Sequence, residues 1–141
     1  MSKKNLLIKR IQEFFQNRQE IILVYLFGSV LNEVNCRDID IGVVIDTNNL
    51  KGEFQKLEYE LAIARELESF LGPPYSEIDL KILNSSPLYF QYEVIKSGEI
   101  IFCKNEKERV TYEAQLQIEY LDLIPLLAVH EKTLRKEIKE W

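Results

Sequence analysis

The fold is decided by residues 21–46, which read IILVYLFGSVLNEVNCRDIDIGVVID. The stretch opens with seven consecutive apolar or aromatic residues, 21–27. Such a short continuous run predicts a strand that is buried on both faces. Gly28 and Ser29 follow at once, where the backbone can turn sharply and expose free N–H groups. If a helical turn comes next, those amides and the helix dipole form an anion site suited to phosphate.

Two aspartates introduce the second apolar run of the same stretch. Asp38 and Asp40 are two residues apart, so both side chains leave the same face of a strand predicted over 39–45. The opposite face receives the alternating apolar residues Ile39, Ile41, Val43 and Ile45. Two carboxylates on one face of a buried strand repel each other and lose hydration, so they need a cation. A phosphate turn beside a cation site indicates a nucleotide site.

A third aspartate lies on a later strand. Residues 77–83 alternate so that Asp79 and Lys81 face away from the apolar side chains Ile78, Leu80 and Ile82. An aspartate on a strand is unfavourable unless it lies at an exposed edge or has a function. Taken alone, Asp79 fits a solvated edge residue. Beside the paired aspartates, we interpret it as the third carboxylate of the site.

The remaining pattern is helical, with one further strand, and predicts an α/β (α+β) fold. Amphipathic spacing predicts helices over residues 5–18 and 53–71. For the second helix we expect a buried stripe of Phe54, Leu57, Leu61, Ala64, Leu67, Phe70 and Leu71, and a solvated face of Glu58, Glu60, Glu66 and Glu68. Ser86 as N-cap and Pro87 begin a helix that ends near 96, and residues 99–103 form a short edge strand.

The last segment, residues 105–141, is predicted to be helical from a capping box at Asn105 and Glu108, with a kink or split at Pro125. One apolar stripe comprises Tyr112, Leu116, Tyr120, Leu123, Leu127, Leu134 and Ile138, and a second comprises Val110, Ala114, Ile118, Leu121 and Ala128. We expect one stripe to pack on the rest of the chain and the other to form a partner or self-association surface. The alternative is that the whole segment wraps into its own core.

Asp46 and His130 are the other polar residues that could belong to the predicted site. Asp46 is either a fourth carboxylate or the cap of a turn, and its place about 20 Å along the strand from Asp40, at roughly 3.3 Å per residue, favours the cap. His130, the only histidine, has no second histidine or cysteine beside it, and we assign it no chemistry.

Composition limits the classes of function. The chain has 141 residues, which favours one domain. A protein that binds a long polyanionic substrate usually has a basic face, and the net charge of −5 argues against one here. Direct nucleic-acid binding is therefore not expected. We expect no membrane span and no signal peptide. Cys36 and Cys103 without metal-ligand spacing favour free thiols in the cytoplasm.

The combination of Gly28-Ser29, Asp38-x-Asp40 and Ile78-Asp79-Leu80 resembles the minimal nucleotidyltransferases of the polymerase-beta superfamily, and most closely the MNT-domain antitoxins that pair with HEPN-domain toxins. The resemblance covers nearly the whole chain. It implies a small mixed β-sheet with helices packed on it, a catalytic core over 1–104 and a partner-binding helical segment over 105–141. The loop between Ser29 and Asp38 is shorter than the family pattern, and Arg37 replaces a common serine or threonine.

The resemblance also implies roles. Gly28 and Ser29 would bind the β- and γ-phosphates of ATP. Asp38 and Asp40 would hold the magnesium ion bound to the triphosphate, and Asp79 would join them at a second ion and help deprotonate the attacking hydroxyl.

Arg37 has no fixed role in this scheme. It either neutralises the aspartates in the empty site, reaches the triphosphate, or is an ordinary residue of a surface loop.

Three functions follow from the resemblance. The first is a magnesium-dependent protein adenylyltransferase that moves AMP from ATP to a tyrosine hydroxyl of a HEPN toxin and so acts as the antitoxin. The second is a catalytically weak antitoxin that neutralises its partner by binding alone. The third, ranked lower, is a small-molecule nucleotidyltransferase of the aminoglycoside-modifying type.

Overall fold

The computed structural model describes residues 2–28, 38–46, 48 and 50–139, with the backbone alone at 134, 135 and 137–139. Its centre is a four-stranded sheet in the order β3-β2-β1-β4, formed by β1 (Ile21–Phe27), β2 (Asp38–Ile45), β3 (Glu77–Ile82) and β4 (Glu99–Cys103). Strand β1 is antiparallel to β2 and β4, whereas β2 and β3 are parallel. The sheet is therefore mixed, as the sequence predicts, and the strand over 99–103 lies at its edge.

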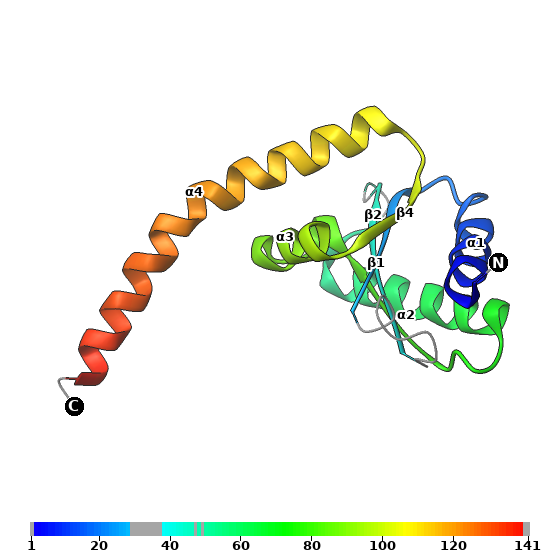
Figure 1. Cartoon of the computed structure of the whole chain (residues 1–141), viewed down its shortest axis with the longest axis horizontal. Coiled ribbons are helices and arrows are strands. Elements are labelled where there is room, and N and C mark those ends of the chain that lie inside the picture. Colours follow the sequence, from blue (N-terminus) through cyan, green and yellow to red (C-terminus); the bar gives the residue numbers. More distant parts are fainter. Residues whose placement is uncertain (1, 29–37, 47, 49, 140–141) are drawn as a thin grey trace.

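Helices cover both faces of the sheet (Figure 1). Helices α1 (Lys3–Phe15) and α2 (Gly52–Leu71) pack on one face. The larger core on this face contains Ile39, Ile41, Val43 and Ile45 of β2 and Ile78, Leu80 and Ile82 of β3. Helix α2 also makes the crossover that the parallel pair β2 and β3 requires. The other face carries a smaller core of Leu23, Tyr25, Val44, Leu83 and Val94, the last from helix α3 (Leu88–Ser97).

The buried stripe of α2 differs from the sequence prediction. Ile63, Ala64, Leu67 and Leu71 are buried, whereas Phe54 is 73% exposed and Leu57, Leu61 and Phe70 are also exposed. Helical periodicity identifies an apolar face but cannot tell which flank of that face meets a sheet. The prediction of Phe54, Leu57, Leu61 and Phe70 as core residues is therefore wrong.

The boundaries of several elements also shift. Strand β3 ends at Ile82, and residues Leu83–Ser85 form the short 3₁₀ helix η2. Ser86 is not the N-cap of α3, because its hydroxyl donates to the Ile82 carbonyl at 2.7 Å and the helix begins at Leu88. Gly42 of β2 lies under Leu83, where a Cβ would approach the leucine side chain to 2.8 Å. The lack of a side chain at Gly42 thus lets η2 pack closely on the sheet.

The last helix, α4 (Glu106–Lys139), begins directly after the predicted cap Asn105, whose side chain accepts the Lys107 amide at 2.9 Å. Its first turns pack on the sheet and α3: Tyr25 donates to Glu113 at 2.7 Å, and the rings of Tyr92 and Tyr120 stack with centroids 3.8 Å apart. The helix continues through Pro125, and Figure 1 shows it changing direction in its orange part rather than splitting.

The two apolar stripes of α4 have different fates. Tyr112, Leu116, Tyr120 and Leu123 are buried or half-buried, whereas Val110, Ala114, Ile118, Leu121 and Ala128 are exposed. The second half of the helix leaves the body of the chain (Figure 1), and Leu127 of the packed stripe is 45% exposed as well. The prediction of one packed and one exposed stripe therefore holds for the described side chains up to Leu123 and is wrong for Leu127. No helix in the described part of the chain has a long enough apolar stretch to cross a membrane.

Candidate active site

The strand register places the three predicted aspartates at one corner of the sheet. Asp40 of β2 lies directly opposite Asp79 of β3, and Phe27, the last residue of β1, lies opposite Asp40 on the other side. Residues directly opposite each other on paired strands project from the same face. Asp38 and Asp40 therefore share a face with Asp79, away from the isoleucine core.

A cavity of about 420 Å³ opens at this corner, lined by Asp38, Asp40, Glu68, Ser76, Glu77, Ile78 and Asp79. Five of these seven residues carry carboxylates, counted as Asp38, Asp40, Glu68, Glu77 and Asp79. The pKa of Asp40 is raised above its usual range, first by burial and then by the charges of Asp79 and Asp38. The site thus holds concentrated negative charge, which a cation would relieve.

Gly28 closes the corner on the β1 side. Its φ of +80° lies in the left-handed region, and a Cβ built there would overlap Oδ2 of Asp40 and lie 3.1 Å from Cγ. A side chain at this position would therefore be strained and would displace the carboxylate. Glycine lets the backbone that leaves β1 lie directly against Asp40.

The other predicted site residues are placed as follows. Ser29 and Arg37 lie outside the described residues. Asp46 follows the far end of β2, where its Oδ1 accepts the Asn48 amide at 3.0 Å. It caps a turn, which agrees with the favoured interpretation, and it is not a fourth carboxylate of this corner.

Three side chains at the corner were not assigned to the site from sequence. Glu77 lies opposite Asp38 in the β2–β3 register, so its position two residues before Asp79 was the available signal. Lys81, two residues after Asp79, places Nζ 3.7 Å from Asp79 Oδ1 and offsets part of the negative charge. Glu68 comes from α2, and no pattern within β3 could have indicated it.

The donor set fits a magnesium ion that brings ligands of its own. Within the described residues, no three aspartate, glutamate, histidine or cysteine side chains are grouped closely enough to hold a metal ion by themselves. Magnesium usually binds through one or two carboxylates and keeps waters and substrate phosphates in its shell, so a preformed cage is not required. Burial, followed by the charges of Asp79 and Asp38, raises the pKa of Asp40, and a bound cation would offset the repulsion among these carboxylates.

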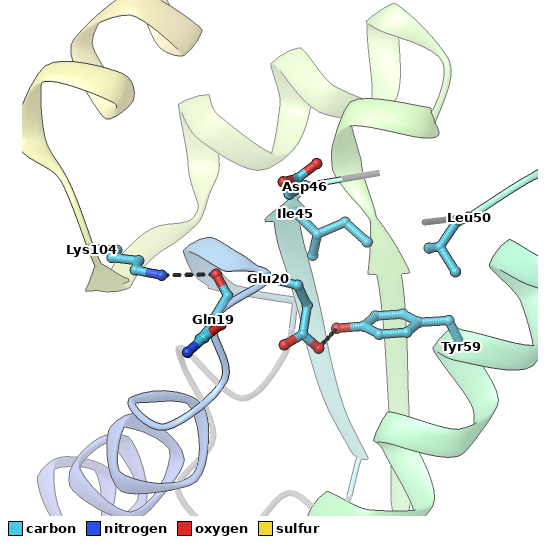
Figure 2. Close-up of a pocket in the computed structure, with 7 residues that line it drawn as sticks. All are labelled: Gln19, Glu20, Ile45, Asp46, Leu50, Tyr59 and Lys104. Atoms are coloured by element: carbon cyan, nitrogen blue, oxygen red, sulfur yellow. Dashed lines mark hydrogen bonds between the residues drawn. The ribbon is translucent and has the colours of Figure 1, made fainter. Parts of the chain in front are cut away.

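A larger cavity, of about 780 Å³, lies at the opposite end of the sheet (Figure 2). Figure 2 shows Tyr59 donating to Glu20, at 3.0 Å, and Lys104 donating to the Gln19 carbonyl, at 2.8 Å. Its charged side chains Glu20, Lys104 and Asp46 therefore already make hydrogen bonds within the chain, Asp46 by accepting the Asn48 amide. The corner of the sheet that holds Asp38, Asp40 and Asp79, called the aspartate corner below, brings like charges together and is the better candidate for catalysis.

A mixed sheet with two aspartates on one strand, a third on its parallel neighbour and Gly28 beside them carries the residues on which the resemblance to nucleotidyltransferases rests. The chain belongs to the family described as "Polymerase beta, Nucleotidyltransferase", whose profile matches residues 9–107. A search of curated protein sequences gives no significant match.

Solved structures share the fold over nearly the whole chain. A chain of the MntA–HepT toxin–antitoxin superposes with a TM-score of 0.65 at 20% identity, covering 92% of this chain and 98% of that one. A chain of the tri-AMPylated Shewanella oneidensis HEPN toxin in complex with MNT antitoxin gives 0.66 at 20% identity, covering 93% and 98%. A toxin–antitoxin structure with AMP-PNP gives 0.66 at 21% identity, covering 90% and 98%.

Proposed function

We propose that this chain transfers AMP from ATP to a hydroxyl group, most readily that of a tyrosine, on a HEPN-domain partner, and that it thereby acts as an antitoxin. The observation that carries the proposal is the register that sets Asp40 opposite Asp79, with Gly28 against Asp40, in a chain of the nucleotidyltransferase family. The tri-AMPylated HEPN toxin in a structure with the same fold supports the choice of acceptor.

The nucleotide would enter beside Gly28. The backbone amides of residues 28 and 29 and the Ser29 hydroxyl would bind the β- and γ-phosphates, and Arg37 is a candidate contact to the same groups. Asp38, Asp40 and Asp79 would hold magnesium, which when bound neutralises charge on the phosphates and on the attacking oxygen. The negative charge already concentrated around Asp40 makes this corner attractive to the metal complex of ATP rather than to free ATP.

The transfer step assigns a separate task to Asp79. The acceptor oxygen forms a bond to the α-phosphorus, the bond from that phosphorus to the bridging oxygen breaks, and pyrophosphate leaves with the electron pair. The acceptor's proton passes to the Asp79 carboxylate and then to solvent. Lys81, 3.7 Å from Asp79, opposes the build-up of negative charge on this side of the corner.

The partner surface is proposed on α4, whose part beyond residue 120 carries exposed apolar side chains, namely Leu121, Ile124, Leu126, Leu127 and Val129. In Figure 1 this part of the helix stands clear of the sheet, so a partner can cover it without blocking the aspartate corner. Residues 1–104 would then form the catalytic core and 105–141 the partner-binding segment. Self-association through the same surface is the competing use.

A second candidate function is an antitoxin that acts by binding alone. The exposed apolar face of α4 favours it, because covering a partner with this face needs no catalysis.

The two functions are separated by incubating the chain with a HEPN-domain partner and ATP labelled at the α-phosphate. Labelled partner, lost when magnesium is chelated or when Asp79 is changed to Asn, supports transfer. Unlabelled partner in a stable complex supports binding alone.

Binding of ATP–magnesium at 100 times its dissociation constant should also stabilise the chain by about 2.7 kcal/mol. No change in melting temperature together with no heat of binding would contradict a nucleotide site.

A further inference from the structure

Two glutamates of α2 hold the outer side of the edge strand β3. Glu68 Oε1 accepts the backbone N–H of Ile78 at 3.1 Å, and Glu60 Oε2 accepts that of Ile82 at 2.8 Å. The sequence pattern placed both glutamates on the solvated face of the helix. In the structure they are half-buried and replace the hydrogen bonds that a further strand would supply.

The spacing of the two contacts follows from the geometry of the elements. Eight residues of an α-helix span about 12 Å, and four residues of a strand span about 13 Å. The helix runs antiparallel to the strand, so Glu60 and Glu68 match Ile82 and Ile78 in reverse order. Ala64, midway between the glutamates, is buried. A small residue there suits a helix that must lie close to its strand.

The Glu68–Ile78 and Glu60–Ile82 hydrogen bonds differ in how close they lie to the candidate active site. Ile78 immediately precedes Asp79, and Glu68 lines the candidate active-site cavity. Ile82 is three residues beyond Asp79, and Glu60 does not line that cavity. The inner side of β3 is fixed by its pairing with β2, which sets Asp79 opposite Asp40. Of the two glutamate contacts on the outer side, that of Glu68 is the nearer to Asp79 along the strand.

We propose that Glu68 is a positioning residue for Asp79. By accepting the Ile78 N–H, it fixes the edge strand at the residue before Asp79 and so keeps the Asp79 carboxylate opposite Asp40. This role rests on the proposed transfer function. Glu60 makes the same kind of contact without adjoining the site, and the chain therefore contains its own matched control for a role that is only structural.

The test compares Glu68→Ala with Glu60→Ala, and with Glu68→Gln, which keeps a carbonyl oxygen that can accept the Ile78 N–H. Amide hydrogen exchange and the carboxyl-carbon NMR signal of Asp79 are measured in the nucleotide-free protein. AMP transfer then gives kcat and KM for ATP. If Glu68→Ala does not fold, Glu68→Met, which keeps the length of the side chain without its acceptor, takes its place.

We expect each alanine variant to speed exchange at its own partner amide by at least about tenfold. Only Glu68→Ala should shift the Asp79 signal and lower kcat by at least about tenfold with KM changed by less than about threefold. Glu68→Gln should recover most of kcat. Equal effects of the two alanine variants on kcat and on the Asp79 signal, or an unmoved Asp79 signal in Glu68→Ala, would overturn the proposal.

The NMR and exchange arms need no catalysis. A wild-type chain that transfers no AMP therefore refutes the proposed function, whereas the Asp79 signal in Glu68→Ala still decides whether Glu68 positions that residue.

Discussion

Replacement of Gly28 by alanine tests the contact between the turn and Asp40, and the chain offers a matched control. Gly28 and Gly52 both have a positive φ in the left-handed range, +80° and +78°. A Cβ at Gly28 would overlap the Asp40 carboxylate, whereas a Cβ at Gly52 would meet no atom within 4 Å. Both variants therefore carry the left-handed strain, and only Gly28→Ala must also move Asp40.

The magnitudes follow from these two terms. A non-glycine residue in the left-handed region costs about 1–2 kcal/mol, which is the loss of unfolding free energy expected for Gly52→Ala. Moving the Asp40 carboxylate off its rotamer adds about 0.5–1.5 kcal/mol, so Gly28→Ala should lose about 1.5–3.5 kcal/mol. The carboxylate is the flexible end of a side chain, and the extra loss of stability is therefore small. The loss of function should be large, because Asp40 lies at the centre of the aspartate corner.

Chemical denaturation and AMP transfer, run on both variants, provide the assay. Gly52→Ala should transfer AMP at the wild-type rate, and Gly28→Ala should be at least about a hundredfold slower, equivalent to about 2.7 kcal/mol of barrier. If the two variants transfer AMP equally well, the close approach of Gly28 to Asp40 has no catalytic meaning.

Three further predictions concern the charges of the site and the attachment of α4. Asp40→Asn should raise the melting temperature of the nucleotide-free protein at neutral pH. Because the pKa of Asp40 is raised in the folded state, the folded state loses stability as the pH rises from the ordinary value of 3.8 through the raised pKa. Melting curves over a pH range should show the gain vanish below pH 3.8, the ordinary value, and a gain independent of pH would contradict this origin. Tyr25→Phe should lower the free energy of unfolding by about 0.5–1.5 kcal/mol, since it removes the donor to Glu113, and an unchanged denaturation midpoint would show that this bond does not secure α4. Leu127→Asp should weaken partner binding in a titration while leaving ATP–magnesium binding unchanged, and undiminished association would move the partner surface elsewhere.

Much of the fold could be predicted because strand parity is a local property. The alternation around Asp38 and Asp40, and around Asp79, determines the face of each side chain before any pairing is known. What parity cannot supply is the position of a neighbouring element. The face that α2 turns to the sheet, and hence the exposure of Phe54 and the contact of Glu68 with Ile78, depend on where the helix crosses β3.

The residues of the candidate site show the same limit: the sequence predicts the aspartates on the strands, but not the residue contributed by a neighbouring element. Asp79 could be assigned because a carboxylate on a strand needs a reason, whereas Glu68 is an ordinary residue for a helix surface and carries no such signal. Lys81 was placed on the correct face from its spacing, but only the 3.7 Å approach of its ammonium to Asp79 gives it a place in the site.

The central claim is that Asp79 serves the attacking hydroxyl while Asp38 and Asp40 anchor the nucleotide, and the most direct measurement is AMP transfer and ATP–magnesium binding in Asp79→Asn. This change keeps the size of the side chain and removes its charge. Binding should stay within a few-fold of the wild type while transfer falls by orders of magnitude, each tenfold being about 1.4 kcal/mol of barrier. Asp38→Asn and Asp40→Asn should impair both. An Asp79→Asn chain that transfers AMP at nearly the wild-type rate would contradict the account and leave Asp79 as a solvated residue of an edge strand.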